Sequence, residues 1–242
     1  MKFVRGGLQM TTIRDCIAPD RNPKVPSIKL PEGSIDTHVH IFESQYPLFE
    51  GRGYNPPDST LDDLKHLHSQ LGVSRVVYTQ PSPYGVDNSA ILKGMKVMND
   101  ETPGRARGVC AIKMDVSDDF LEDLDKQGIK GVRLNMDNIG GMPIGLDEIP
   151  TLEARIKDLG WHVEYLFPGK DIVELAPIFK KSSVPISIAH FAYQPATNGI
   201  NSEGFKTLLD LVRDGNTWIK ISGANRVSET DLPPYDDVMP MA

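Results

Sequence analysis

The chain has 242 residues, of which 39% are hydrophobic and 24% charged, and its 33 acidic and 26 basic side chains give a formal net charge of −7. This length suits one α/β barrel. Because acidic side chains outnumber basic ones, the protein has no overall positive potential that would attract nucleic acid or an anionic membrane. The sequence has no apolar run of membrane-spanning length, no signal-like start and only two distant cysteines, so we expect a cytoplasmic protein without disulfides.

The order of the predicted elements indicates a βα repeat. Residues 1–33 form a polar, proline-bearing lead-in, and from residue 34 onward short β-branched runs alternate with amphipathic stretches. The expected strands are Ser34–His38, Arg75–Thr79, Ala106–Ile112, Gly131–Leu134, Trp161–Phe167, Pro185–Ala189 and Trp218–Ser222. The expected helices are Leu61–Leu71, Ser89–Asn99, Phe120–Gln127, Leu152–Leu159, Ile172–Lys180 and Phe205–Arg213.

Two folds are built from such repeats, an open doubly wound sheet and a closed barrel. Neither a GxGxxG turn nor a GxxxxGK[ST] loop follows an expected strand, which removes the main support for a nucleotide-binding sheet. We therefore predict a (β/α)8 TIM barrel over residues 34–242. The chain ends in SETDLPPYDDVMPMA, which we interpret as the acidic start of a seventh helix, so the barrel is expected to be C-terminally incomplete and to lack its eighth strand.

A pair of histidines in the first expected strand carries the strongest chemical signal. Side chains alternate along a strand, so His38 and His40 face the same side, and in a barrel they would reach the C-terminal mouth where such enzymes have their active sites. By the same parity Asp36 would lie deeper and orient one imidazole through a hydrogen bond. His190 ends another strand and would face the pair. The alternative is that these are ordinary strand histidines.

Two arginines at the ends of expected strands point to an anionic substrate. A guanidinium holds a carboxylate through two parallel hydrogen bonds, and Arg133 and Arg226 both stand where a barrel would present them to its mouth. The alternative for each is a solvated surface side chain. A small anionic molecule is therefore the expected partner, with no role for nucleic acid or membrane.

Seven sequence segments carry a resemblance to a known family. DTHVH, GRGYNPPDST, QPSPYGVDN, KGVRLN, WHVEY, AHF and WIKISGANR resemble the amidohydrolase-related family (amidohydrolase family 2) that includes lactonases of pyrone dicarboxylates and sugar acids. The resemblance implies a distorted barrel that hydrolyses or isomerises a lactone, with three histidines polarising the carbonyl and five residues binding carboxylates or hydroxyls. The histidines are His38, His40 and His190, and the binding residues are Tyr54, Ser82, Arg133, Tyr165 and Arg226. Only one of the successive residues Glu164 and Tyr165 can face the interior, and Tyr165 is chosen because the resembled family has a tyrosine at this place; a packing role is the alternative.

The resemblance also bears on metal content. The larger superfamily often holds metals with a lysine and a histidine where this chain has Arg133 and Tyr165, and the branch resembled is generally metal-independent. We therefore expect no cofactor. The alternative is a single zinc ion on His38, His40 and His190, which would make the protein a mononuclear hydrolase or decarboxylase.

The predicted activity is the opening of an anionic lactone by direct attack of water. The sequence has no GxSxG elbow, so a covalent acyl-enzyme is not expected. In the resembled family an aspartate after the eighth strand is the general base, and nothing after Arg226 matches it. The alternative from another class is a non-catalytic barrel fragment whose open strand edges favour association, and a homo-oligomer is part of that expectation.

Overall fold

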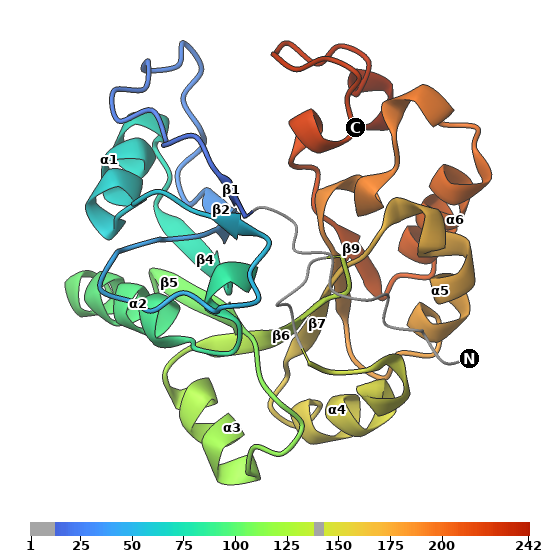
Figure 1. Cartoon of the computed structure of the whole chain (residues 1–242), viewed down its shortest axis with the longest axis horizontal. Helices are drawn as coiled ribbons and strands as arrows, with labels where there is room; N and C mark the ends of the chain where they lie inside the picture. Colours follow the sequence, from blue (N-terminus) through green and yellow to red (C-terminus); the bar gives the residue numbers. More distant parts are fainter. Residues whose placement is uncertain (1–12, 138–142) are drawn as a thin grey trace.

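The computed structural model describes residues 13–137 and 143–242, so residues 1–12 of the expected lead-in lie outside it. Within these residues a curled parallel sheet has seven strands in the order β2-β4-β5-β6-β7-β8-β9, each hydrogen-bonded to the next (Figure 1). The strands are β2 Ile35–Val39, β4 Arg75–Thr79, β5 Ala106–Cys110, β6 Ile129–Asn135, β7 His162–Leu166, β8 Ile186–Ile188 and β9 Thr217–Ile219.

The six α-helices of the described residues lie around the outside of the sheet (Figure 1). Their bounds are α1 Leu61–Leu71, α2 Ser89–Glu101, α3 Asp118–Lys126, α4 Ile149–Ile156, α5 Ile172–Phe179 and α6 Glu203–Arg213. Local sequence sets several ends: Thr60 forms a capping box with Asp63 at the start of α1, and Gly72 ends that helix with φ of 78°, a left-handed conformation that glycine adopts without strain. The expected strands and helices are confirmed, with ends that differ by up to three residues.

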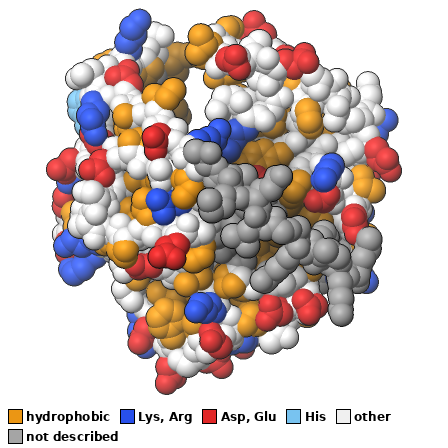
Figure 2. Space-filling model, viewed as in Figure 1, with side chains coloured by type: hydrophobic (Ala, Val, Ile, Leu, Met, Phe, Trp, Pro, Cys, Tyr) orange, Lys and Arg blue, Asp and Glu red, His pale blue; other side chains and the backbone are white. Residues whose placement is uncertain are grey.

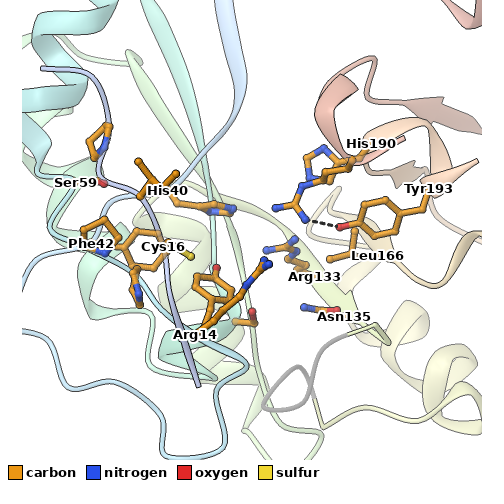
Figure 3. A pocket seen from close by; sticks show the side chains of 17 residues that line it. Arg14, Cys16, His40, Phe42, Ser59, Arg133, Asn135, Leu166, His190 and Tyr193 are labelled. Atoms are coloured by element: carbon orange, nitrogen blue, oxygen red, sulfur yellow. Dashed lines mark hydrogen bonds between the residues drawn. The ribbon is translucent and has the colours of Figure 1, made fainter. Parts of the chain in front are cut away.

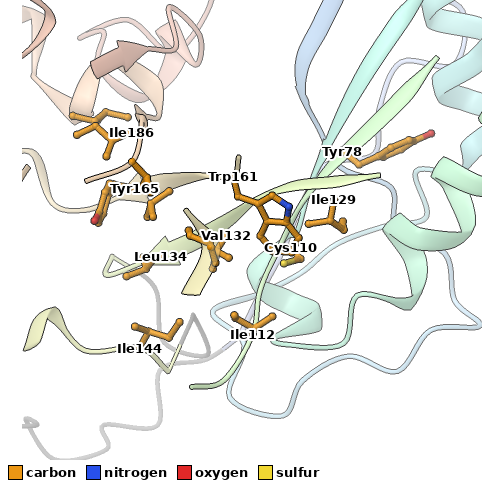
Figure 4. Packing of buried hydrophobic residues seen from close by; sticks show 14 of the residues in the cluster. Tyr78, Cys110, Ile112, Ile129, Val132, Leu134, Ile144, Trp161, Tyr165 and Ile186 are labelled. Atoms are coloured by element: carbon orange, nitrogen blue, oxygen red, sulfur yellow. The ribbon is translucent and has the colours of Figure 1, made fainter. Parts of the chain in front are cut away.

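The apolar layer between strands and helices stabilises this arrangement (Figure 4). Trp161 and Tyr165 are fully buried, and the Tyr165 ring lies 4.6 Å from that of Phe179 on α5. The Trp161 indole also donates to Asp125 at the end of α3, 2.7 Å away, so its one polar group is satisfied. Burying each such side chain contributes about 2 to 3 kcal/mol.

Two segments differ from the sequence prediction. The lead-in contributes a strand, β1 Arg14–Asp15, which pairs in parallel with β3 Tyr54–Asn55 in the loop after β2. Residues 228–242, all described, hold a short 3-10 turn at Met239–Met241 in place of the expected α-helix. Three prolines in that stretch remove backbone donors, and Asp237 accepts from Ser228 Oγ and the Glu229 amide to form a turn instead.

The curled seven-stranded sheet with its outer helices is a half-barrel, as expected for a distorted TIM barrel. That this chain lacks the eighth strand of the barrel remains a prediction. In the face shown in Figure 2, acidic and basic side chains are intermixed over the surface. Among the described residues, none of the helices combines the length and the apolar character needed to span a bilayer.

Candidate active site

A cavity of about 350 Å³ opens at the carboxyl ends of the strands (Figure 3). Its walls come from distant parts of the chain: the lead-in, the loops after β2 and β4, the end of β6 and the segments after β8 and β9. The polar and ionisable side chains that line it are Arg14, Cys16, His40, Tyr54, Ser59, Ser82, Arg133, Asn135, His190, Tyr193 and Arg226. This is the end of the sheet at which α/β barrels have their active sites.

The three predicted histidines meet beside this cavity. The His38 ring centroid lies 5.0 Å from that of His40 and 4.8 Å from that of His190. His40 and His190 line the cavity, whereas His38 lies behind them with its side chain 9% exposed. The His40 Nδ1 contacts the Thr79 carbonyl at 2.7 Å, and the His190 Nδ1 contacts Ser222 Oγ at 3.0 Å. Each ring is therefore held by a fixed partner.

Asp36 does not orient these rings, and that prediction is wrong. The pairing of β2 with β4 changes register between Asp36 and Val39, so alternation of side chains is interrupted at that point. Asp36 instead faces α1, where its carboxylate lies 3.2 Å from Nε2 of the buried His68. His38 lies within the irregular stretch and turns inward, to the side of His40 and His190. Simple parity along the strand therefore holds for His38 and His40 but fails for Asp36.

Tyr165 also differs from its expected place. It is Glu164 whose side chain faces the interior, while the Tyr165 ring packs outward against Phe179. Burial raises the pKa of the Tyr165 phenol, as expected for a hydroxyl in an apolar layer. Tyr165 does not line the cavity, so its predicted contact with substrate is wrong. Alternation was used correctly, but the wrong member of the pair was assigned to the interior.

Glu164 belongs to a buried group of charges that the sequence prediction missed. Lys220, the residue after β9, donates to Glu164 Oε2 and to the Thr37 carbonyl, the latter at 2.9 Å. Glu164 Oε1 lies 3.4 Å from Arg133 Nε and 3.7 Å from His38 Nδ1. We call His38, His40, Arg133, Glu164 and Lys220 the inner cluster. The alternation of side chains along β7 was the one feature of the sequence that could have placed Glu164 in the interior. No local motif set Lys220 apart from other lysines.

Burial and charge keep the histidines neutral. Burial is the largest cause that lowers the pKa of His38 well below 6.5 and that of His40 to about 3, and Arg133 adds to the effect on His40. The pKa of His190 falls to about 4 through burial and the nearby Arg226. Burial opposes ionisation of Glu164, but Lys220 and Arg133 outweigh it and hold the pKa of that carboxyl below its usual range.

The predicted anion-binding residues surround the open part of the cavity. Arg133 donates from Nη1 to the Gln80 carbonyl at 2.8 Å, and Arg226 donates from Nη1 to the Tyr193 hydroxyl at 3.2 Å. Tyr54 and Ser82 both line the cavity, and their contact with substrate stays a prediction.

The sequence prediction missed several other lining residues. These are Arg14, Cys16, Ser59, Asn135 and Tyr193. We call the more accessible residues Arg14, Tyr54, Tyr193 and Arg226 the rim. No local motif identified Arg14, because its place depends on the pairing of β1 with β3.

The alternative zinc site would use His38, His40 and His190 as its ligands. The described residues contain no cluster of three or more His, Cys, Asp or Glu side chains arranged to hold a metal ion. The Lys220 ammonium lies 3.1 Å from His38 Nδ1, where it opposes a second cation. The three histidines therefore do not fit the zinc set as they stand. Independence of metal remains a prediction.

Comparison with known proteins agrees with this geometry. Residues 35–240 match the amidohydrolase family described as Amidohydro_2. The chain belongs to this family. Among its relatives, the 2-pyrone-4,6-dicarboxylate hydrolase of Comamonas testosteroni is 33% identical over 91% of this chain and 74% of that protein. The 4-sulfomuconolactone hydrolase of Hydrogenophaga intermedia is 32% identical over 94% of this chain and 74% of its own length.

A solved structure extends the similarity of this amidohydrolase to three dimensions. The probable 2-pyrone-4,6-dicarboxylic acid hydrolase of Acinetobacter baumannii, crystallised with citric acid bound, superimposes with a TM-score of 0.74 at 28% identity. The match covers 86% of this chain and 76% of the other. The expected family is thus confirmed.

Proposed function

We propose that this amidohydrolase opens an anionic ring lactone by direct attack of water. The observation that carries the proposal is the charge of the cavity. Arg14, Arg133 and Arg226 line it, and no Asp or Glu does so among the described residues. A carboxylate-bearing ring would compensate that charge through charge-assisted hydrogen bonds. The names of the relatives, both hydrolases of anionic lactones, support the same chemistry.

The chemical step needs donors at the carbonyl oxygen. Water adds to the carbonyl carbon, negative charge develops on the carbonyl oxygen, and the ring C–O bond then breaks to give an open acid, with a proton transferred to the former ring oxygen. Imidazole N–H groups preset around that oxygen lower the barrier, and one such donor is worth about 3 to 4 kcal/mol. His38 and His190, held neutral beside the arginines, provide this combination.

Metal independence is part of the proposal, because the Lys220 ammonium lies 3.1 Å from His38 Nδ1, nearer than the Glu164 carboxylate at 3.7 Å. The test is hydrolysis of a panel of lactones, with and without a chelator, by the wild-type protein and by His190→Ala. The panel pairs 2-pyrone-4,6-dicarboxylate and aldarolactones with neutral lactones of similar ring size.

We expect turnover of the anionic lactones that resists chelation and is lost in His190→Ala. Activity abolished by the chelator and restored by zinc would replace this mechanism with the mononuclear metal alternative. Equal turnover of neutral and anionic lactones would contradict the assignment of the arginines. Hydrolysis of none of the panel would reject the proposed function.

A further inference from the structure

Lys220 connects the last and first strands of the parallel sheet at its open side. It follows β9, yet its ammonium group reaches the end of β2, where it contacts the Thr37 carbonyl at 2.9 Å and His38 Nδ1 at 3.1 Å. Its third partner is Glu164 Oε2 on β7. The Lys220 side chain is 12% exposed and Glu164 is fully buried, so water competes little for these contacts.

The number of protons on Lys220 decides the direction of each hydrogen bond. An ammonium has three N–H donors and no acceptor, and Lys220 has three partners. The Thr37 carbonyl and the Glu164 carboxylate can only accept hydrogen bonds. His38 Nδ1 must therefore also accept, which means that it carries no proton. The buried charge of Glu164 favours the ammonium over a neutral amine, because an unpaired carboxylate at that position is costly.

A neutral imidazole without a proton on Nδ1 carries it on Nε2. His38 Nε2 is buried and has no hydrogen-bond partner among the described residues. A buried donor without a partner is uncommon in folded proteins and is expected where a ligand completes the site. The rings of His40 and His190, which line the cavity, lie next to it.

His40 has the opposite arrangement. Its Nδ1 lies 2.7 Å from the Thr79 carbonyl, which can only accept, so the proton is on Nδ1 and Nε2 has a lone pair. The two histidines of the HxH segment therefore offer different groups to a ligand. His38 provides a donor and His40 an acceptor.

We propose that Lys220, held by Glu164, is a positioning residue that keeps His38 in its Nε2–H form, so that this N–H donates to the lactone carbonyl oxygen. His40 then accepts a hydrogen bond from the attacking water or from a substrate hydroxyl, rather than sharing the role of His38. This inference rests on the proposed function for the identity of the ligand. The tautomers themselves do not depend on it.

The test is a nitrogen NMR experiment on protein labelled with ¹⁵N-histidine, in which two-bond correlations separate the two tautomers. His38 and His40 are assigned by the signals lost in His38→Asn and His40→Asn. In the wild type we expect His38 with a proton on Nε2 and His40 with a proton on Nδ1. A proton on Nδ1 of His38 would overturn the proposal, and this result needs no other variant and no substrate.

The variant Lys220→Met tests the effect of this lysine on the His38 tautomer and on catalysis. We expect a mixed His38 tautomer, a loss of kcat on the order of 100-fold and a small change in KM, because the lost donor acts mainly in the transition state. Lys220→Arg, which keeps a cationic donor, should recover part of kcat and of the Nε2–H signal. Lys180→Met is the matched control, since Lys180 is half-exposed and pairs with Asp214 on the outer surface.

The outcomes separate the two proposals. An unchanged His38 tautomer in Lys220→Met would reject the positioning role even if activity falls. If Lys220→Met does not fold, the double variant Lys220→Met with Glu164→Gln removes both buried charges and repeats the measurement. Correct tautomers in a protein that hydrolyses no lactone would reject the proposed function and leave the assignment of His38 intact.

Discussion

The inner cluster, of which His40 and Arg133 line the cavity, and the rim are held in place in different ways. Inner-cluster residues come mainly from the strands, contact one another or the backbone, and are largely shielded from water. Rim residues come from the lead-in and from loops, and Arg14 and Arg226 are exposed. Buried charges are costly to leave unpaired, whereas exposed ones are screened by solvent. Changes in the inner cluster should therefore affect stability and kcat, and changes in the rim should affect KM.

Arg133→Met is expected to give the largest effect. It removes the guanidinium 3.4 Å from Glu164 and the donor to the Gln80 carbonyl, and truncating one partner of a buried pair costs about 3 to 5 kcal/mol. We expect a fall of kcat/KM on the order of 1000-fold and a lower midpoint in urea unfolding. Arg107→Met, at an exposed position on β5, is the control. A variant of normal stability with only KM raised would place Arg133 with the rim.

Lowering the pH should destabilise the folded protein through the inner histidines. The pKa of His40 is about 3 in the fold, below the ordinary value of 6.5, so the unfolded chain binds a proton that the folded state excludes. The free energy of unfolding contributed by this group is fully present above the unfolded pKa. It decreases as the pH falls from about 6.5 toward the folded value.

Urea unfolding between about pH 7 and pH 5 measures this effect. The slope of the unfolding free energy against pH should become smaller in His40→Gln, which lacks the titrating group. The control is His66→Gln, at an exposed position of α1. An identical slope in His40→Gln and the wild type would show that His40 is not held neutral by the fold.

Arg14→Ala should give a smaller effect, confined to binding. The Arg14 side chain points toward the cavity from the side of Phe42 and Cys16, opposite His190 and Tyr193 (Figure 3). We expect KM for an anionic lactone to rise by about 5- to 10-fold, since an exposed charged hydrogen bond is worth about 1 kcal/mol. Arg21→Ala, from the same lead-in but paired with Asp63, is the control. A fall in kcat without a rise in KM would remove the distinction between rim and inner cluster.

Tyr165→Phe should have almost no effect on catalysis. The phenol lies in the apolar layer against Phe179, on the face of β7 opposite Glu164. We expect kcat/KM within about twofold of the wild type and a change in unfolding free energy of less than about 1 kcal/mol. Steady-state kinetics beside Glu164→Gln would make the contrast between the two faces direct. A loss of activity as large as that of Glu164→Gln would mean that Tyr165 reaches the substrate.

The sequence by itself determined the repeat, the positions of the strands and helices, and the meeting of three histidines at one end of the sheet. These features depend on local periodicity and on glycines that end helices, such as Gly72. They also depend on the rule that the carboxyl ends of parallel strands lie at the same edge of the sheet.

Only the tertiary structure decided which residues complete the site. Alternation of side chains defines two faces of β7 but does not say which face is inside. The sequence prediction therefore placed Tyr165 in the interior, where the structure has Glu164. A single irregularity in the β2 ladder turned Asp36 toward His68. Lys220 meets His38 across 182 positions of sequence, and Arg14 reaches the cavity through its pairing with the loop that holds Tyr54. Such contacts depend on how the sheet curls and on ladder register, and no local pattern records either.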